Sequence, residues 1–146
     1  MSTETTLMMV LANPVSAEHE QAFNDWYTSV HIPDLLALGV TASTRYRVPS
    51  GRSSAHGYLA VHEIASDRLD EVMEAIRLAQ VEGRMGLSPT LDAETAELYF
   101  FTAITDRIGA DRAPAMLADP RYPDLKATEE RYVMPAAERP AGSAGR

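Results

Sequence analysis

The hydrophobic and polar positions of the chain follow two periods, one typical of strands and the other typical of helices. Apolar side chains dominate residues 6–12, and a continuous apolar run of this length predicts a strand buried on both faces. From about Ala17 onwards, apolar side chains recur at spacings of three and four, which predicts a helix. The apolar face of this helix consists of Phe23, Trp26, Tyr27 and Val30. We expect this face to pack on a sheet.

The following residues predict a hairpin, a second helix and a last strand. Apolar and polar side chains alternate over residues 40–48, and the apolar run at 58–64 pairs with them as a hairpin across a loop rich in serine and glycine. Ser66 is expected to cap the second helix, whose apolar side chains again repeat at three and four. Residues 96–104 predict the final strand.

This order of elements predicts an α+β fold of the ferredoxin-like βαββαβ type, in which a four-stranded antiparallel sheet carries two helices on one face. The strands at 6–12 and 96–104 have apolar side chains on both faces, so the face without helices also needs cover. A two-fold dimer that stacks sheet on sheet supplies this cover. We therefore predict a homodimer whose two sheets form a dimeric α+β barrel.

The character of the chain changes after Thr105, and this change divides it into three parts. Residues 1–105 form the predicted α+β barrel domain. Residues 106–135 are rich in proline but retain apolar side chains, so we expect a docking C-terminal extension that wraps the partner subunit or covers a pocket. Residues 136–146 lack such apolar anchors and are expected to form a disordered tail.

Charge and cysteine content exclude several classes of function. The whole net charge of −8 falls on the residues up to Thr105, and an acidic domain repels phosphate backbones, so no nucleic-acid partner is expected. The absence of cysteine excludes disulfides, thiolate metal sites and thiol nucleophiles. The first residues, MSTETTLMMVLA, resemble neither a signal peptide nor a membrane anchor, so we expect a cytoplasmic protein without a membrane partner.

His31 is the first candidate for chemistry, because it stands between the aromatic end of the first helix and a proline. Pro33 should hold Ile32 in an extended conformation and start a new short helix. His31 then lies at a break between two helices, with its pKa near ~6.5, where a general acid or base works best at neutral pH. The alternative is a histidine that caps helix carbonyls. Asp34 either fixes the His31 tautomer or stabilises the N-terminus of the second helix.

Four further side chains are candidates for the same site. Tyr27, one helical turn before the histidine, is a candidate proton donor, and Trp26 beside it is either a core residue or a ligand contact. Arg45 either lies on a solvated rim of the sheet or binds a substrate oxygen. His62 lies in a strand, where it is either a satisfied core histidine or a second polar group of the pocket.

Other kinds of active site have no support in the sequence. Histidines and carboxylates do not occur at metal-binding spacings, and glycine-rich phosphate loops and a serine nucleophile elbow are missing. The remaining chemistry is proton transfer and electrostatic stabilisation in a mostly apolar pocket. We therefore expect neither a metal nor a cofactor.

The stretch FNDWYTSVHIPDLLALGVTASTRYR, residues 23–47, resembles the EthD-like branch of the dimeric α+β barrel proteins. Members of that branch show an aromatic-rich first helix with a W/Y-x-x-x-H-x-P pattern, a leucine-rich turn, and a strand that bears an arginine and an aromatic residue. At the level of fold pattern the resemblance extends over residues 7–105. It implies that the histidine matching His31 lines a cleft between the helices and the sheet.

Together these features predict a cofactor-free small-molecule enzyme of the lyase, cyclase or isomerase type. His31 acts as general acid or base on an apolar aromatic or polyketide-like substrate, while Tyr27 or Arg45 stabilises negative charge on oxygen. The resemblance also implies two alternatives, a cofactor-independent monooxygenase and a haem-dependent variant, because related barrels include both. A non-catalytic ligand-binding protein that uses the same pocket is the remaining alternative.

Overall fold

The computed structural model describes residues 4–129 of the chain. These residues belong to two compact units that separate after Ile104. The expected division into residues 1–105, 106–135 and 136–146 stays a prediction, and its last segment lies outside the described residues.

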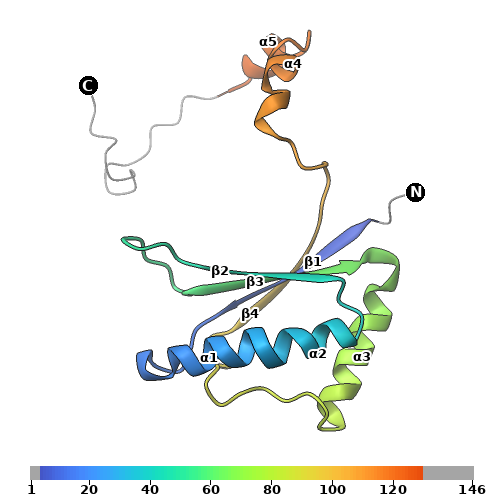
Figure 1. The fold of residues 1–146 in the computed structure, drawn as a ribbon. Coiled ribbons are helices and arrows are strands. Elements are labelled where there is room, and N and C mark those ends of the chain that lie inside the picture. Colours follow the sequence, from blue (N-terminus) through green and yellow to red (C-terminus); the bar gives the residue numbers. More distant parts are fainter. Residues whose placement is uncertain (1–3, 130–146) are drawn as a thin grey trace. The chain divides into compact units, whose positions relative to one another are not determined.

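A four-stranded antiparallel sheet forms the centre of the first unit (Figure 1). Its strands are β1 (Thr5–Ala12), β2 (Ala42–Arg47), β3 (Tyr58–Ala65) and β4 (Glu97–Thr102). The strand order β2-β3-β1-β4 places the first and third strands in the middle of the sheet. The predicted α+β fold with a four-stranded antiparallel sheet is confirmed, and its strand order is compatible with a ferredoxin-like arrangement.

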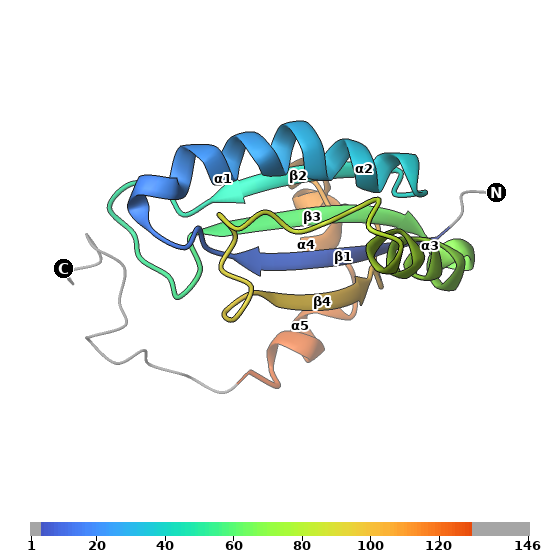
Figure 2. The same cartoon turned by 90° about the horizontal axis from the view of Figure 1, so that it is seen from below.

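The helices of this unit lie on one face of the sheet (Figures 1 and 2). They are α1 (Glu20–Trp26), α2 (Ile32–Ala37) and α3 (Leu69–Val81), and a π-helical turn, Tyr27–His31, joins α1 to α2. Figure 2 shows α1 and α2 running along the β2 edge of the sheet, while β4 forms the opposite edge. Within residues 4–129, the helices are too short or too polar to cross a membrane.

The expected break at Ile32 is wrong, because α1, the π-helical turn and α2 form one continuous helix. Ile32 has helical dihedral angles, φ −61° and ψ −49°, and its backbone N–H donates to the carbonyl oxygen of Tyr27, five residues earlier. A proline has no N–H, and its ring crowds the carbonyl four residues before it. The wider π-helical turn gives the ring of Pro33 room, so the helix widens where the sequence predicted an end.

The π-helical turn also changes which side chains face the sheet. Phe23 and Tyr27 are buried as predicted and Trp26 is half-buried, but Val30 is 49% exposed. The extra residue in this turn rotates the following side chains about the helix axis. His31 consequently lies against Tyr27, with 4.9 Å between the ring centroids. The prediction that Val30 packs on the sheet is therefore wrong.

Ser66 does not cap the second helix. A short 3-10 turn, Ser66–Arg68, precedes α3, and the residue at its N-terminal boundary is Ala65. The Ser66 hydroxyl instead shares a hydrogen bond of 2.7 Å with the hydroxyl of Thr6. The start of β1 lies beside Ser66, whose backbone N–H donates to the carbonyl oxygen of Glu4. Because the Ser66 hydroxyl bonds to Thr6 of this strand, it does not cap the helix.

The core lies between the helices and the inner face of the sheet, and it has two parts. One part joins α3 and α2 to the sheet through residues that include Met8, Leu35, Ile64, Val72 and Ile76. The other part joins α1 and the π-helical turn to the sheet through Ala12, Phe23, Tyr27 and Ala60. Burial of these apolar side chains holds the continuous helix and α3 on the same face of the sheet.

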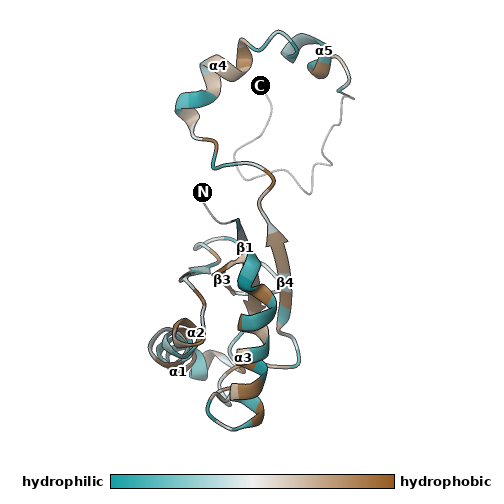
Figure 3. Ribbon diagram, turned by 90° about the vertical axis from the view of Figure 1, so that its right-hand side faces the viewer, coloured by the Kyte–Doolittle hydropathy of each residue, from teal (hydrophilic) through white to brown (hydrophobic). Residues whose placement is uncertain are grey.

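The opposite face of the sheet also carries apolar side chains, which we call the outer apolar face: Leu7, Met9, Leu11, Tyr99 and Phe101. The register places Phe101 opposite Leu7 and Tyr99 opposite Met9. Phe101 is 54% exposed and Tyr99 is 44% exposed. Figure 3 shows β4 as hydrophobic along most of its length. The first unit thus leaves one apolar face of its sheet uncovered.

The second unit contains two short helices, α4 (Ala113–Leu117) and α5 (Tyr122–Lys126). Both have a proline at one of their first two positions, where its missing N–H costs no helical hydrogen bond. The side chains of Met116, Leu117, Tyr122 and Leu125 line a groove of about 440 Å³ within this unit. These are apolar anchors of the expected docking extension, and the docking itself stays a prediction.

Candidate functional site

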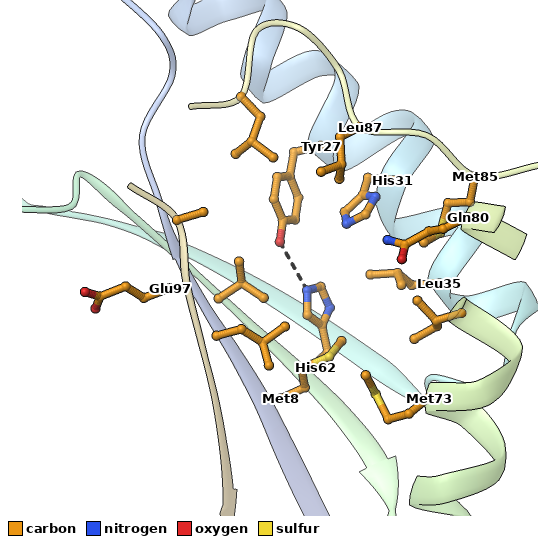
Figure 4. A pocket seen from close by; sticks show the side chains of 15 residues that line it. Met8, Tyr27, His31, Leu35, His62, Met73, Gln80, Met85, Leu87 and Glu97 are labelled. Atoms are coloured by element: carbon orange, nitrogen blue, oxygen red, sulfur yellow. Dashed lines mark hydrogen bonds between the residues drawn. The ribbon is translucent and has the colours of Figure 1, made fainter. Parts of the chain in front are cut away.

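A cavity of about 260 Å³ lies between the helices and the inner face of the sheet (Figure 4). Its polar lining residues are Tyr27, His31, His62, Gln80 and Glu97. Apolar side chains of β1, α3 and the segment between α3 and β4 form most of the remaining wall; they include Met8, Met73, Met85 and Leu87. The fold therefore brings three of the sequence candidates, Tyr27, His31 and His62, to one cavity.

His62 sits at the floor of this cavity, fully buried on β3. Its Nε2 lies 3.3 Å from the Tyr27 hydroxyl, and its Nδ1 lies 2.7 Å from the Ser43 hydroxyl on the neighbouring strand β2. A neutral imidazole donates from one nitrogen and accepts at the other, so this ring links two hydroxyls into one chain of hydrogen bonds. His62 is thus both a satisfied core histidine and a lining residue of the pocket.

Burial keeps this chain of hydrogen bonds uncharged at neutral pH. Burial is the larger cause of a pKa of about 4 for His62, and the neighbouring imidazole of His31 contributes in the same direction because two positive charges repel each other. Burial also raises the pKa of the Tyr27 hydroxyl to about 12, while the nearby Arg45 guanidinium acts in the opposite direction. Tyr27 is therefore a phenol and His62 a neutral imidazole at pH 7.

His31 differs from His62 because its Nδ1 is buried without a hydrogen-bond partner among the described residues. Its ring stacks on Trp26, with 4.8 Å between the centroids, and meets the Tyr27 ring edge-on. An unpaired buried polar atom costs about 1–3 kcal/mol and is rare in a folded protein, so it marks His31, which lines the cavity, as a candidate functional residue. The structure thus places one unsatisfied imidazole beside one phenol.

The sequence led us to expect that the pKa of His31 stays near its ordinary value. In the structure this pKa is lowered. Burial lowers it, and the carboxylate of Asp34 opposes this effect. The expected balance between two helix ends does not exist, because the helix is continuous at this point. A lowered pKa leaves His31 neutral at pH 7, the form that accepts a proton.

Asp34 has neither of the roles that the sequence offered for it. Within residues 4–129 no hydrogen bond joins its carboxylate to the His31 ring, and α2 has no separate N-terminus for it to stabilise. Its influence on the site is the electrostatic effect on the pKa of His31. Asp34 does not line the cavity.

Arg45 lies under the first helix, and the expected solvated rim is wrong for this residue. Its guanidinium lies 4.6 Å from the centroid of the Tyr27 ring and is also close to the rings of Phe23 and Tyr58. It donates hydrogen bonds to Asn24 Oδ1 at 2.9 Å and to Thr28 Oγ1 at 3.0 Å. Arg45 thus stabilises the Tyr27 ring by a cation–π contact and does not line the cavity.

Trp26 likewise stays outside the cavity lining. Its indole packs against the rings of Tyr27 and His31 and fixes their orientation. Trp26 therefore contacts two residues that line the cavity, but it is not itself among the lining residues.

Sequence reasoning missed Ser43 and the apolar wall that the 85–91 segment supplies. The alternation in residues 40–48 did separate Ser43 and Arg45 from the apolar positions. It could not show that this polar side of β2 faces the helices. Ser43 becomes a neighbour of His62 only because the hairpin register pairs these two residues.

Comparison with known proteins does not identify a relative: no family model and no curated protein matches the chain. Within residues 4–129, histidine and carboxylate side chains do not gather in a group of three or more that could hold a metal ion.

Proposed function

We propose that the protein is a small-molecule enzyme that moves a proton on a substrate bound in the cavity, as in a lyase, cyclase or isomerase. The observation that carries this proposal is the His31 imidazole in the cavity lining, beside the Tyr27–His62 hydrogen bond and with no partner for its buried Nδ1 among the described residues. A neutral imidazole accepts a proton, and a phenol donates a hydrogen bond to developing negative charge on oxygen. Both groups occur here in a mostly apolar enclosure, where such interactions are strong.

The proposed step begins when His31 removes a proton from a carbon next to a substrate carbonyl. The carbonyl oxygen then carries the negative charge, which the Tyr27 hydroxyl stabilises. In an isomerisation, the imidazolium returns its proton to a different carbon. In a dehydration, the C–O bond of a hydroxyl group on the β carbon breaks, and this group takes the proton from the imidazolium and leaves as water. Neither outcome needs an oxidant or a reductant.

The relationship to the EthD-like branch and the homodimeric barrel also remain proposals. The order of the strands, the aromatic residues of the first helix and the position of His31 at the cavity support the relationship. The uncovered outer apolar face supports a dimer, because an apolar area of this kind is usually buried. We further propose that the C-terminal extension docks through the groove between α4 and α5, and that the protein works in the cytoplasm.

A test of the proposed chemistry can use 2-tetralone, a neutral bicyclic ketone with acidic protons next to its carbonyl. In deuterium oxide, a base in the cavity should speed the exchange of these protons for deuterons, which proton NMR measures directly. General base catalysis typically contributes about 10²–10⁴-fold. We expect His31→Gln to lose an acceleration of this order.

The matched control is His19→Gln, since His19 is exposed and bonds only to Ser16. This variant should exchange 2-tetralone as fast as the wild type does. Bound 2-tetralone that exchanges equally fast with wild type and with His31→Gln contradicts proton transfer by His31 and favours a binding protein without chemistry.

A further inference from the structure

The charges around the cavity restrict the ligands that it can hold. None of the described residues that line it carries a positive charge at neutral pH. Arg45 lies 4.6 Å from the centroid of the Tyr27 ring, is absent from the cavity lining, and already donates to Asn24 and Thr28. A buried carboxylate or phosphate on the ligand would therefore lack a countercharge, which is costly in an apolar enclosure.

Glu97 is the charged residue among those that line the cavity, but its carboxylate points away from the histidines (Figure 4) and accepts a hydrogen bond from Tyr99, so it does not bind the ligand. The overall charge of the domain also opposes an anionic ligand. The residues up to Thr105 carry the whole net charge of −8, which disfavours the approach of anions.

The polar atoms inside the cavity favour a ligand with a neutral oxygen. When His62 carries its proton on Nε2, it donates to the Tyr27 oxygen and accepts from Ser43 at Nδ1. The phenolic proton of Tyr27 is then free to donate into the cavity. A carbonyl oxygen accepts such a proton without bringing a charge into the cavity.

From these observations we infer that the cavity selects an uncharged, mostly apolar ketone or enone of one or two rings, and that it rejects the corresponding carboxylate. The volume agrees with this size, because about 260 Å³ exceeds the roughly 150 Å³ of a cavity that holds benzene. The inference rests on the proposed function only in that it concerns the same cavity. Among the lyase reactions, it excludes the decarboxylation of a carboxylic acid.

Three matched ligands test the inference: 2-tetralone, its hydrocarbon tetralin, and 1,2,3,4-tetrahydro-2-naphthoate. Isothermal calorimetry on the full chain at pH 7 gives the dissociation constant of each. We expect 2-tetralone to bind about three- to tenfold more tightly than tetralin, the worth of one neutral hydrogen bond. Tetrahydronaphthoate should bind at least tenfold more weakly than 2-tetralone.

Tyr27→Phe identifies the donor, since it removes the hydroxyl and retains the buried ring. It should abolish the preference for 2-tetralone over tetralin and leave the binding of tetralin nearly unchanged. Equal or tighter binding of tetrahydronaphthoate, or no binding of 2-tetralone, overturns the inference. Selective binding of 2-tetralone without deuterium exchange would support the ligand class while contradicting the proposed proton transfer.

Discussion

Burial of the single residue His62 determines the charge of the site. The imidazole is fully enclosed and satisfied by two hydroxyls, so protonation would place an extra charge in an apolar core. In the unfolded chain the same imidazole is free to take up a proton near its ordinary pKa of 6.5. As the pH falls below 6.5, the unfolded state therefore gains protons first, and the folded state loses stability.

We predict that this loss occurs between pH 6.5 and about 4 and reaches about 3 kcal/mol, because the pKa of His62 is lowered to about 4. His62→Gln should remove this part of the pH dependence, even if it lowers stability at pH 7. Urea unfolding of both proteins at several pH values measures the effect. The same slope in both proteins over this range would contradict the assignment to His62.

In the continuous first helix, one widened turn positions a functional group. Without the π-helical turn, the side chains after Tyr27 would keep the α-helical phase, and His31 would be rotated about the helix axis. The helix ends at Ala37, and Leu38 caps it. Gly39 follows with φ +117°, a conformation that residues with side chains rarely adopt. The turn at Gly39 leads the chain from α2 into β2.

Gly39→Ala should destabilise the protein for two reasons. The residue has a positive φ, and an added Cβ would lie 2.7 Å from Cγ2 of Val72, a buried and β-branched side chain of α3. Gly51→Ala is the control, because Gly51 also has a positive φ, +82°, but has nothing within 4 Å of such a Cβ.

We expect Gly51→Ala to cost about 1 kcal/mol of unfolding free energy and Gly39→Ala to cost about 1–3 kcal/mol more. Chemical denaturation measures both values. Equal costs for the two variants would mean that Val72 moves aside without penalty.

The outer apolar face of the sheet is uncovered within the first unit of a single chain. Phe101 and Tyr99 on β4 face the same side as Leu7 and Met9 on β1, and the helices of the first unit, α1 to α3, cover the other side of this sheet. We predict that two copies of the chain bury this face against each other, so that light scattering gives twice the chain mass.

Phe101→Glu should yield a monomer that remains folded, since Phe101 is already 54% exposed within one chain. Val81→Glu is the matched control, because Val81 is 73% exposed at the end of α3 and lies outside the outer apolar face. A wild-type monomer, or dissociation of both variants alike, would show that this face is not the dimer interface.

The sequence by itself determined the kinds of elements, their order and the main candidates of the site. Apolar spacing along the chain depends on local geometry, so the strands, α3 and the buried positions of Phe23 and Tyr27 were predictable. The aromatic and proline residues around His31 likewise marked it as a special position.

Only the tertiary structure decided how these candidates meet. The hairpin register brings Ser43 to His62, and packing under α1 makes Arg45 a support for Tyr27. The widened turn at Tyr27–His31 rotates the histidine toward Tyr27 and lowers its pKa by burial. Each of these facts depends on atoms far apart in the chain or on the phase of one helical turn, which side-chain periodicity does not record.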